Sequence, residues 1–389
     1  MRSNTIFLQL LQLFCRYRFK KCVDRFEGDK YTKRFNCWQQ FIVLLFAQAK
    51  GLDSLRDIEV SLKSHYRKWY HLGLTSVARS TLADANNNRS SDIFRDVFYA
   101  LFEKCRELAP KHKFKFKNPL YTFDSTLINV CLSLFSWAKY RTKKGAFKLH
   151  TLLDHSGYLP SFLVISEGKT HDINVVKDDA YGFPELSPDS ILLIDRAYID
   201  FKWLYSLTIK KLFFVTKAKR NMKYEIIGQH KVPKNKGVVS DNRIRLMNFY
   251  QSKAYPKELR LITYIDRKTG EEHVFLTNNF ALAAGTIAEL YKSRWEVETF
   301  FKWIKQNLKI KSFLGTSQNA VMTQIWAAMI YYLLLSFIKF QTKCRHSLHE
   351  LTHIVGELLL NNIYLIETLT ITFDEYKRIK SNNTQLAFW

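Results

Sequence analysis

Two runs of the sequence decide the fold class: LYTFDSTLINV, residues 120–130, and ILLIDRAYI, residues 191–199. The β-branched and aromatic residues of the first run favour a strand that contains Asp124. Four consecutive apolar residues open the second run, which is typical of a strand buried on both faces, and Asp195 follows them directly. Because α/β sheets bind ligands at the carboxyl ends of such strands, we predict that both aspartates serve a metal or a cation. Either one alone could instead cap a turn or form a salt bridge.

The neighbouring runs extend this pattern to a sheet. Turn residues from Asp154 to Gly157 separate FKLHTLLD from YLPSFLVIS and predict a β-hairpin. Residues 211–219, KLFFVTKAK, are typical of a further strand, and helices fit the sequence between Asp172 and Tyr181 and again after Asp200. Antiparallel strands followed by alternating strands and helices predict a mixed α/β sheet.

Two other parts of the chain have different patterns. Residues 1–115 are basic and have helical periodicity, with Gly51 and Gly73 predicted to end helices and Asp53 predicted to begin one. Residues 221–280 are β-rich, with lysine-rich turns between the strands. We therefore predict a compact helical module before the sheet and a β-rich insertion within it.

A third acidic residue lies on a helix predicted over residues 284–308. On an unbroken helix, residues at steps of three, four and seven project within roughly 60° of one another and form one polar stripe. This stripe comprises Tyr291, Arg294, Glu298 and Lys305. Another face gathers apolar side chains that can pack on a sheet, namely Val297, Phe300, Phe301 and Ile304. Glu296 points away from the stripe, so Glu298 is the better candidate ligand. Without the two aspartates, an ordinary amphipathic helix with solvated charges would fit equally well.

Asp124, Asp195 and Glu298 together are the ligand set that phosphoryl transfer with two metal ions requires. Carboxylate oxygens are hard ligands that suit Mg²⁺, and we expect Mn²⁺ to substitute for it. One ion activates water or a 3′-hydroxyl, and the other stabilises the leaving oxygen of an in-line displacement. We expect no further cofactor.

The composition favours a nucleic-acid partner. The 389 residues include 60 Lys and Arg against 35 Asp and Glu, a formal charge of +25 spread along the chain. Such a field favours a polyanion, although a merely basic surface or one that meets anionic lipid is the alternative. The six cysteines form no CxxC pair and have no zinc-finger spacing, so we predict reduced, structural thiols.

Residues 320–338, AVMTQIWAAMIYYLLLSFI, carry no charge and approach the length of a membrane span. Polar residues interrupt this segment and lysine lies on both sides of it, so we expect a buried core helix and no membrane. The N-terminus lacks a small-residue cleavage site. We therefore expect a cytoplasmic, nucleoid-associated bacterial protein.

The motif Tyr-x2-Arg-x3-Glu-x6-Lys matches without a gap the YREK signature of the IS-four family of insertion-sequence transposases; here it comprises Tyr291, Arg294, Glu298 and Lys305. FDST around Asp124 and LIDRAYID around Asp195 resemble the first two catalytic blocks of that family. The N-terminal sequence, KYTKRFNCWQQFIVLLFAQ and then SLRDIE, resembles its DNA-binding region. The resemblance covers nearly the whole chain and is weakest after about residue 345.

The resemblance implies a ribonuclease-H-like core in which Asp124, Asp195 and Glu298 bind metal and catalyse. It implies that the rest of the motif contacts phosphates near the transposon end, namely Tyr291, Arg294 and Lys305. Family members generally nick one strand, form a hairpin with the new 3′-hydroxyl, reopen it and join the 3′ ends to target DNA. A base flipped during hairpin formation would stack on an aromatic residue, for which Trp295 is the first candidate and Phe275 the second; Trp295 could equally be a core aromatic. Further contacts to DNA are predicted for Lys143, Lys148 and Lys302.

We therefore predict a DDE transposase that cuts and pastes its own insertion sequence. Its partners would be double-stranded DNA, as terminal inverted repeats and target, and a second copy of the chain in a homodimer that holds both ends. The expected domains are a helical DNA-binding region (1–115), the first part of the core (116–220), the β-rich insertion (221–280), the second part of the core with the glutamate helix (281–345) and a C-terminal helical region (346–389). Two alternatives stay open: a stand-alone metal-dependent nuclease with the same core, and a DNA-binding protein or decayed copy without chemistry.

Overall fold

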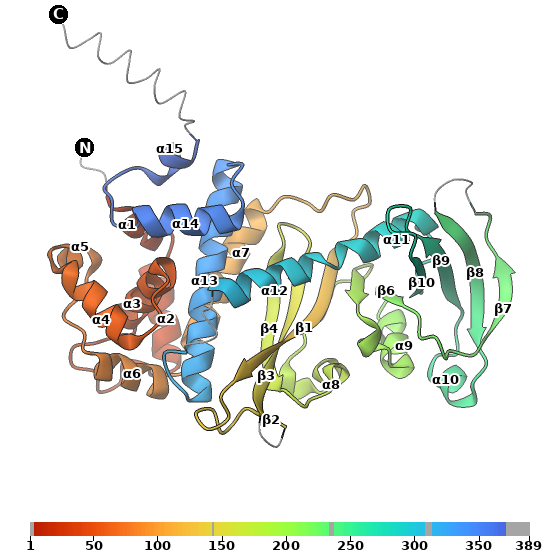
Figure 1. Cartoon of the computed structure of the whole chain (residues 1–389), viewed down its shortest axis with the longest axis horizontal. Coiled ribbons are helices and arrows are strands. Elements are labelled where there is room, and N and C mark those ends of the chain that lie inside the picture. Colours follow the sequence, from red (N-terminus) through yellow and green to blue (C-terminus); the bar gives the residue numbers. More distant parts are fainter. Residues whose placement is uncertain (1–3, 142–143, 233–236, 308–312, 371–389) are drawn as a thin grey trace, which may run out of the picture. The chain divides into compact units, whose positions relative to one another are not determined.

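The computed structural model describes residues 4–141, 144–232, 237–307 and 313–370. The chain forms two compact units (Figure 1). One is helical and combines the described parts of residues 1–110 and 303–389, whereas the other comprises residues 111–302 and contains the sheet. The five functional domains expected from the sequence stay a prediction.

The helical unit is built around α13 (Gln318–Thr342), which packs against α3 (Cys37–Lys50), α6 (Arg79–Asn88) and α7 (Asp92–Leu108). By length and composition α13 could cross a membrane, but 89% of its most apolar window is buried inside the protein. The segment is therefore a core helix, as expected. The other helices of this unit are α1 (Ile6–Leu11), α2 (Arg16–Arg25), α4 (Leu55–Ser64), α5 (Trp69–Leu72), α14 (Leu348–Leu358) and α15 (Leu365–Thr370).

The ends of these helices follow from local chemistry. Gly51 and Gly73 end helices in the left-handed conformation, at φ of 64° and 67°, which glycine adopts without steric cost. The prediction that Asp53 begins a helix is wrong, because the Ser54 side chain caps α4 by accepting a hydrogen bond from the backbone N–H of Asp57. All six cysteines are free; Cys37 and Cys105 are buried, whereas Cys15 and Cys131 are exposed and do not serve as core residues.

The sheet unit contains one ten-stranded mixed sheet with the strand order β2-β3-β1-β5-β6-β10-β9-β8-β7, and β4 pairs with β3. Strands β1, β3 and β4 form an antiparallel meander, whereas β5 lies parallel to β1 and β6 lies parallel to β5. This is the arrangement of a ribonuclease-H-like core. The strands are β1 (Leu120–Val130), β2 (Lys139–Arg141), β3 (Lys144–Asp154), β4 (Leu159–Glu167), β5 (Ile191–Ile194), β6 (Phe213–Lys217), β7 (Tyr224–Gln229), β8 (Val238–Leu246), β9 (Leu259–Ile265) and β10 (Glu272–Thr277).

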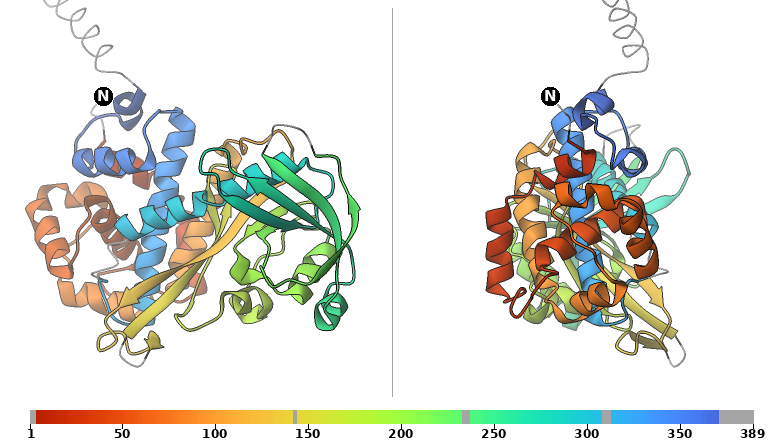
Figure 2. Two further views of the ribbon diagram at one scale, coloured as in Figure 1. Left: turned by 45° about the vertical axis from the view of Figure 1, so that its right-hand side comes forward. Right: turned by 90° about the vertical axis from the view of Figure 1, so that its left-hand side faces the viewer.

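Two predictions about the strands can be compared with this topology. The expected hairpin is confirmed, because Asp154 at the end of β3 pairs with Leu159 at the start of β4. Strands β7 to β10, from the segment expected to be an insertion, continue the same sheet, since β10 pairs with β6 (Figures 1 and 2). Helix α10 (Phe249–Ala254) connects β8 to β9.

Strand β5 is covered on both faces, as its continuous apolar sequence predicted. Leu192 and Ile194 belong to the core that includes residues of α9 (Phe201–Ile209). Ile191 and Leu193 belong to the opposite core, which includes residues of α11 (Ala284–Ser293). Because side chains alternate along a strand, burial on both faces leaves only its carboxyl end for a polar site.

Candidate active site

The two predicted catalytic aspartates lie where the parallel pairing of β1 and β5 ends. Phe123 of β1 is in register with Ile194 of β5, so Asp124 and Asp195 are the next residues along the two strands. Strand β1 continues in its pairing with β3, where Asp124 lies opposite Thr151. Asp195 ends its strand, and its Oδ2 accepts a hydrogen bond of 3.3 Å from the backbone N–H of Ala197. The sheet topology therefore brings together two acids that lie far apart in the sequence.

Arg294 forms hydrogen bonds to both Asp124 and Glu298. Its Nη1 donates to Oδ2 of Asp124 at 2.6 Å, and its Nη2 donates to Oε1 of Glu298 at 2.8 Å. The Arg294 side chain is only 9% exposed, and its Nε has no hydrogen-bond partner among the described residues. A buried guanidinium is costly unless it is paired, so both carboxylates are held firmly against it.

The charge balance of this cluster is negative. Burial raises the pKa of Asp124 to about 6; the nearby charge of Arg294 opposes that rise, whereas the charges of Asp195 and Glu298 add to it. Burial is the main cause of this rise, because removal from water disfavours the charged carboxylate. The three acids therefore lie beside one guanidinium in a site from which water is largely excluded.

The helix that carries Glu298 is interrupted, contrary to the prediction of one helix over residues 284–308. Helix α11 ends at Ser293 and α12 (Glu296–Asn307) begins after two intervening residues, Arg294 and Trp295. At the junction, the N–H of Arg294 bonds to the carbonyl of Tyr291 and the N–H of Glu298 bonds to the carbonyl of Trp295. These contacts span three residues instead of four, so the chain is wound more tightly where Arg294 contacts the two acids.

Two buried tyrosines lie close to the acids. Tyr291 packs its ring on Phe275 with centroids 5.1 Å apart, and burial is the largest cause that raises its pKa to about 12. Burial also raises the pKa of Tyr198 well above its usual range, with further contributions from the charges of Asp172 and Asp124. Both phenols are therefore neutral hydrogen-bonding groups at physiological pH.

The structure adds one acid that the sequence reasoning missed. Oδ1 of Asp172 accepts hydrogen bonds from Oγ of Ser125 at 2.9 Å and from Nζ of Lys148 at 3.0 Å. The backbone N–H of Ser125 in turn donates to Oδ1 of Asp124 at 2.8 Å. No sequence signal marks this arrangement, because Asp172 and Ser125 are 47 residues apart and meet only through the fold.

The remaining predicted DNA contacts differ in accessibility. Trp295 is 62% exposed, so it is not a core aromatic. Phe275 is fully buried and offers no face for stacking. Lys302 and Lys305 are exposed on α12, whereas Lys148 donates to the carbonyl of Thr170 as well as to Asp172. Lys143 lies outside the described residues.

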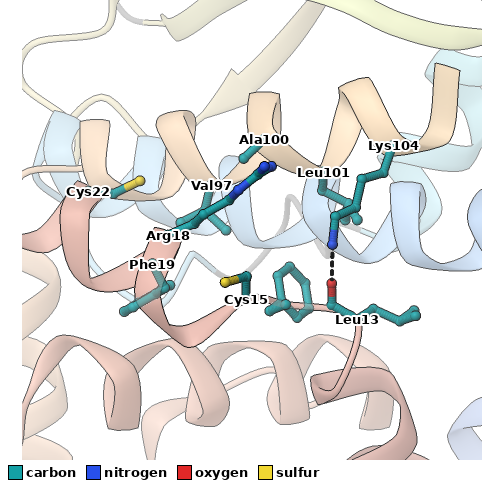
Figure 3. A pocket seen from close by; sticks show the side chains of 10 residues that line it. Leu13, Cys15, Arg18, Phe19, Cys22, Val97, Ala100, Leu101 and Lys104 are labelled. Carbon is teal, nitrogen blue, oxygen red and sulfur yellow. Dashed lines mark hydrogen bonds between the residues drawn. The ribbon is translucent and has the colours of Figure 1, made fainter. Parts of the chain in front are cut away.

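A pocket in the helical unit is not a candidate catalytic site. It lies between α2 and α7, and its lining is mainly apolar (Figure 3). Lys104 at one side donates a hydrogen bond of 2.9 Å to the carbonyl of Leu13. Because no carboxylate lines this pocket, it has neither a general base nor ligands for a hard cation.

The acids of the sheet unit suit a divalent cation in kind and in charge. They supply hard oxygen donors, and the three carboxylates outnumber the guanidinium of Arg294, which contacts two of them. Across the described ranges, no three acidic, histidine or cysteine side chains are already grouped around one point where an ion could bind. Arg294 bridges Asp124 and Glu298 instead, so a metal that bound these two acids would compete with a guanidinium.

Acids that follow the parallel pairing of two adjacent strands in a ribonuclease-H-like sheet are typical of metal-dependent nucleic-acid enzymes. The family model for the transposase DDE domain matches residues 115–334, more than half of the chain. The chain therefore belongs to the transposase DDE family, whose members cleave DNA and join its strands with divalent metal ions. A second family model, for a domain of unknown function (DUF4372), matches residues 2–75.

Individual relatives agree with this assignment. The chain is 33% identical to y4zB of Sinorhizobium fredii, named as a transposase, over 67% of this chain and 71% of that protein. It is 29% identical to a Geobacillus stearothermophilus protein named for insertion sequence element IS5377, over 70% of each chain. A Synechocystis protein named for element IS4SA is 24% identical over 73% of this chain and 78% of its own. The piggyBac transposase synaptic complex with hairpin DNA is a distant structural neighbour, with a TM-score of 0.42 and 10% identity over 97% of this chain and 83% of that one.

Proposed function

We propose that Asp124, Asp195 and Glu298 are the catalytic triad of this transposase and hold Mg²⁺, for which Mn²⁺ substitutes. The observation that carries the proposal is that one guanidinium bridges Asp124 and Glu298 while Asp195 follows the adjacent parallel strand. Bound metal would activate the attacking hydroxyl and stabilise the leaving oxygen at phosphorus.

The protein's own residues orient these groups. Strands β1 and β5 fix the backbones of the two aspartates, and the Ser125 N–H fixes one oxygen of Asp124. Arg294 holds the other oxygen of Asp124 together with Glu298. When the carboxylates exchange Arg294 for another cation, its guanidinium is free to bind a phosphate, a ligand that its planar fork matches.

The proposed reaction follows the cut-and-paste sequence. The enzyme nicks one strand, attacks the other strand with the new 3′-hydroxyl to form a hairpin, reopens the hairpin and joins the 3′ ends to target DNA. The phosphates near the transposon end contact Tyr291, Arg294 and Lys305, and the flipped base stacks on Trp295, whose exposure suits that role. Lys143, Lys148 and Lys302 supply further backbone contacts. A homodimer pairs both ends, and the reaction takes place at the bacterial nucleoid in the cytoplasm.

Two alternatives give different products. A stand-alone nuclease with the same core would leave cut ends that never join target DNA. A DNA-binding protein without chemistry would shift the duplex in a gel without cutting it. The acidic cluster argues against a protein without chemistry, and the transposase relatives favour strand transfer over simple cleavage.

The deciding experiment incubates purified protein and Mg²⁺ with a labelled duplex that carries the terminal repeat and with a supercoiled target plasmid. We expect the wild type to yield 3′-hydroxyl nicks, hairpins and joined products, whereas Glu298→Gln binds the duplex without cutting it. Glu289→Gln, which neutralises an exposed glutamate of α11, is the matched control and should cut normally. Cleavage that survives Glu298→Gln would show that another carboxylate is the ligand, and cut ends without hairpins or joined products would favour the nuclease.

A further inference from the structure

The helical unit contains an open groove that the catalytic proposal does not use. Its walls are the connection of residues 26–35, between α2 and α3, and one side of α6. Its volume of about 1210 Å³ exceeds the roughly 300–1,000 Å³ of a small-molecule site. The groove is therefore larger than a typical small-molecule site.

The α6 wall of the groove presents polar side chains that form no hydrogen bond with other described residues. Thr81, Asp84 and Asn88 follow one another at steps of three and four residues, so they share one helical face. All three are exposed, and within the described part of the chain their side chains form no hydrogen bond. Threonine, aspartate and asparagine supply donors and acceptors of the kind that read base edges in the major groove.

The opposite wall is basic. Lys33 and Arg34 are exposed there, and neither forms an ion pair with any described residue. Lys30 pairs with Glu27 at 2.7 Å, so its charge is already compensated. At the start of α6, Ala78 also lines the groove and supplies no side-chain cap, which leaves backbone N–H groups for an acceptor such as phosphate.

Hydrogen bonds hold the two walls together before any ligand binds. Arg89, directly after α6, donates to the carbonyl of Phe35, to Oγ1 of Thr32 at 3.4 Å and to Oε1 of Gln40 at 3.1 Å. In the buried layer beneath, Nε2 of Gln40 donates to Oδ1 of Asn86 in α6 at 2.9 Å. Because these bonds fix α6 relative to residues 32–35, the groove needs little reorganisation to bind a ligand.

We propose that this groove is the surface that recognises the end of the element as duplex DNA. Lys33 and Arg34 bind the phosphate backbone of one strand, and α6 presents Asp84 and Asn88 to the base edges. The carboxylate of Asp84 repels phosphate, so it favours a register in which a base faces it. This inference rests on the proposed function, because it assigns the terminal repeat of the transposed element as the ligand.

The test measures equilibrium binding of the full chain, without divalent metal, to two labelled duplexes. One carries the terminal repeat of the element that encodes this chain, and the other is a shuffled duplex of the same composition. We expect Asn88→Ala to weaken binding to the terminal duplex roughly 5- to 150-fold and to leave binding to the shuffled duplex unchanged. Lys33→Gln should weaken binding to both duplexes and reduce the salt slope by about 1. Asp84→Asn should bind the shuffled duplex more tightly, which lowers the preference for the terminal duplex.

Lys21→Gln is the matched control, because Lys21 is exposed on α2 and does not line the groove. It loses the same charge as Lys33→Gln and should keep the wild-type affinity and salt slope for both duplexes. Metal-dependent nicking is measured on the same preparations. If the groove variants keep wild-type binding and preference while nicking still requires Glu298, the groove proposal is overturned and the proposed function stands. If the wild type neither prefers the terminal duplex nor nicks it, both proposals are wrong.

Discussion

Arg294 and Asp124 form a largely buried ion pair, in which Nη1 of the guanidinium lies 2.6 Å from Oδ2 of the carboxylate. The other terminal nitrogen of Arg294 contacts Glu298 at 2.8 Å. One side chain therefore supplies positive charge to two of the three predicted metal ligands. Any ion that binds those carboxylates must compete with it.

This competition predicts the effect of removing Arg294. Arg294→Gln should bind Mn²⁺ more tightly than the wild type in the absence of DNA. The affinity should rise about tenfold for each 1.4 kcal/mol of ion-pair energy that metal binding no longer has to overcome. The same variant should nick DNA more slowly, because a phosphate contact is lost. Calorimetric titration with Mn²⁺ measures the affinity, and Arg267→Gln, at an exposed position, is the control. An unchanged or weaker affinity would contradict this interpretation.

The raised pKa of Asp124 predicts how stability depends on pH. Because the folded pKa of about 6 lies above the ordinary 3.8, the contribution of Asp124 to stability is complete below pH 4 and is lost as the pH rises through about 6. Without metal, Asp124→Asn should therefore be more stable than the wild type at pH 7, by up to about 3 kcal/mol. The two proteins should converge near pH 4. Urea unfolding at both pH values measures this difference, and a variant that is less stable at pH 7 would show that the ion pair outweighs burial.

The buried pair between Arg260 and Asp241 should be important for the stability of the sheet unit. Both side chains are about 5% exposed or less, and Arg260 also donates to the carbonyls of Asn279 and Leu282. Arg260→Met should lower the free energy of unfolding by about 3–5 kcal/mol, because it leaves a buried carboxylate unpaired. Arg243→Met, which breaks an exposed pair with Glu258, should cost at most about 1 kcal/mol. If denaturant unfolding showed equal losses of unfolding free energy for the two variants, burial would not explain the importance of the Arg260–Asp241 pair.

Trp295 should affect hairpin formation without affecting folding. Because its side chain is 62% exposed, Trp295→Ala should leave the melting temperature nearly unchanged. Nicked DNA should accumulate and hairpins should fall, since stacking an extruded base contributes about 1–3 kcal/mol. Denaturing gels separate the two products. Tyr250→Ala, at another exposed aromatic residue, should behave like the wild type, and a normal hairpin yield in Trp295→Ala would exclude this residue as the stacking platform.

Lys148 can be tested as a DNA contact and as a partner of Asp172. If Lys148 binds a phosphate, Lys148→Gln should reduce the salt slope of DNA binding by about 1. If its role is to hold Asp172 and, through Ser125, the strand that carries Asp124, the slope should stay the same while the nicking rate falls. The contacts of Lys148 lead us to expect the second result. Asp172→Asn should then slow nicking in the same way.

Patterns that depend on local chemistry were predictable from the sequence. The apolar run of β5 indicated burial on both faces, and turn residues placed the hairpin between β3 and β4. Glycine marked two helix ends correctly, whereas the start of α4 was misplaced by one residue because Ser54 and Asp53 are both good caps.

Features that depend on distant partners were not predictable in this way. No glycine or proline marks the interruption between α11 and α12, where Arg294 reaches two acids, one on another strand. The role of Asp172 depends on Ser125 and Lys148, which precede it by 47 and 24 residues. Periodicity predicts the face of a helix on which a residue lies, but it does not predict which residue of another element that side chain contacts.

The helical unit is discontinuous in the sequence, since α3, α6 and α7 pack on α13 near the other end of the chain. During synthesis the first helices leave the ribosome long before residues 318–342 do, by roughly 10–40 s at ordinary elongation rates of about 5–20 residues per second. Over that interval the nascent chain has no central helix to cover its apolar faces. Helices α3, α6 and α7 therefore gain the helix that covers their apolar faces only after residues 111–302, with the proposed catalytic acids, have also been made.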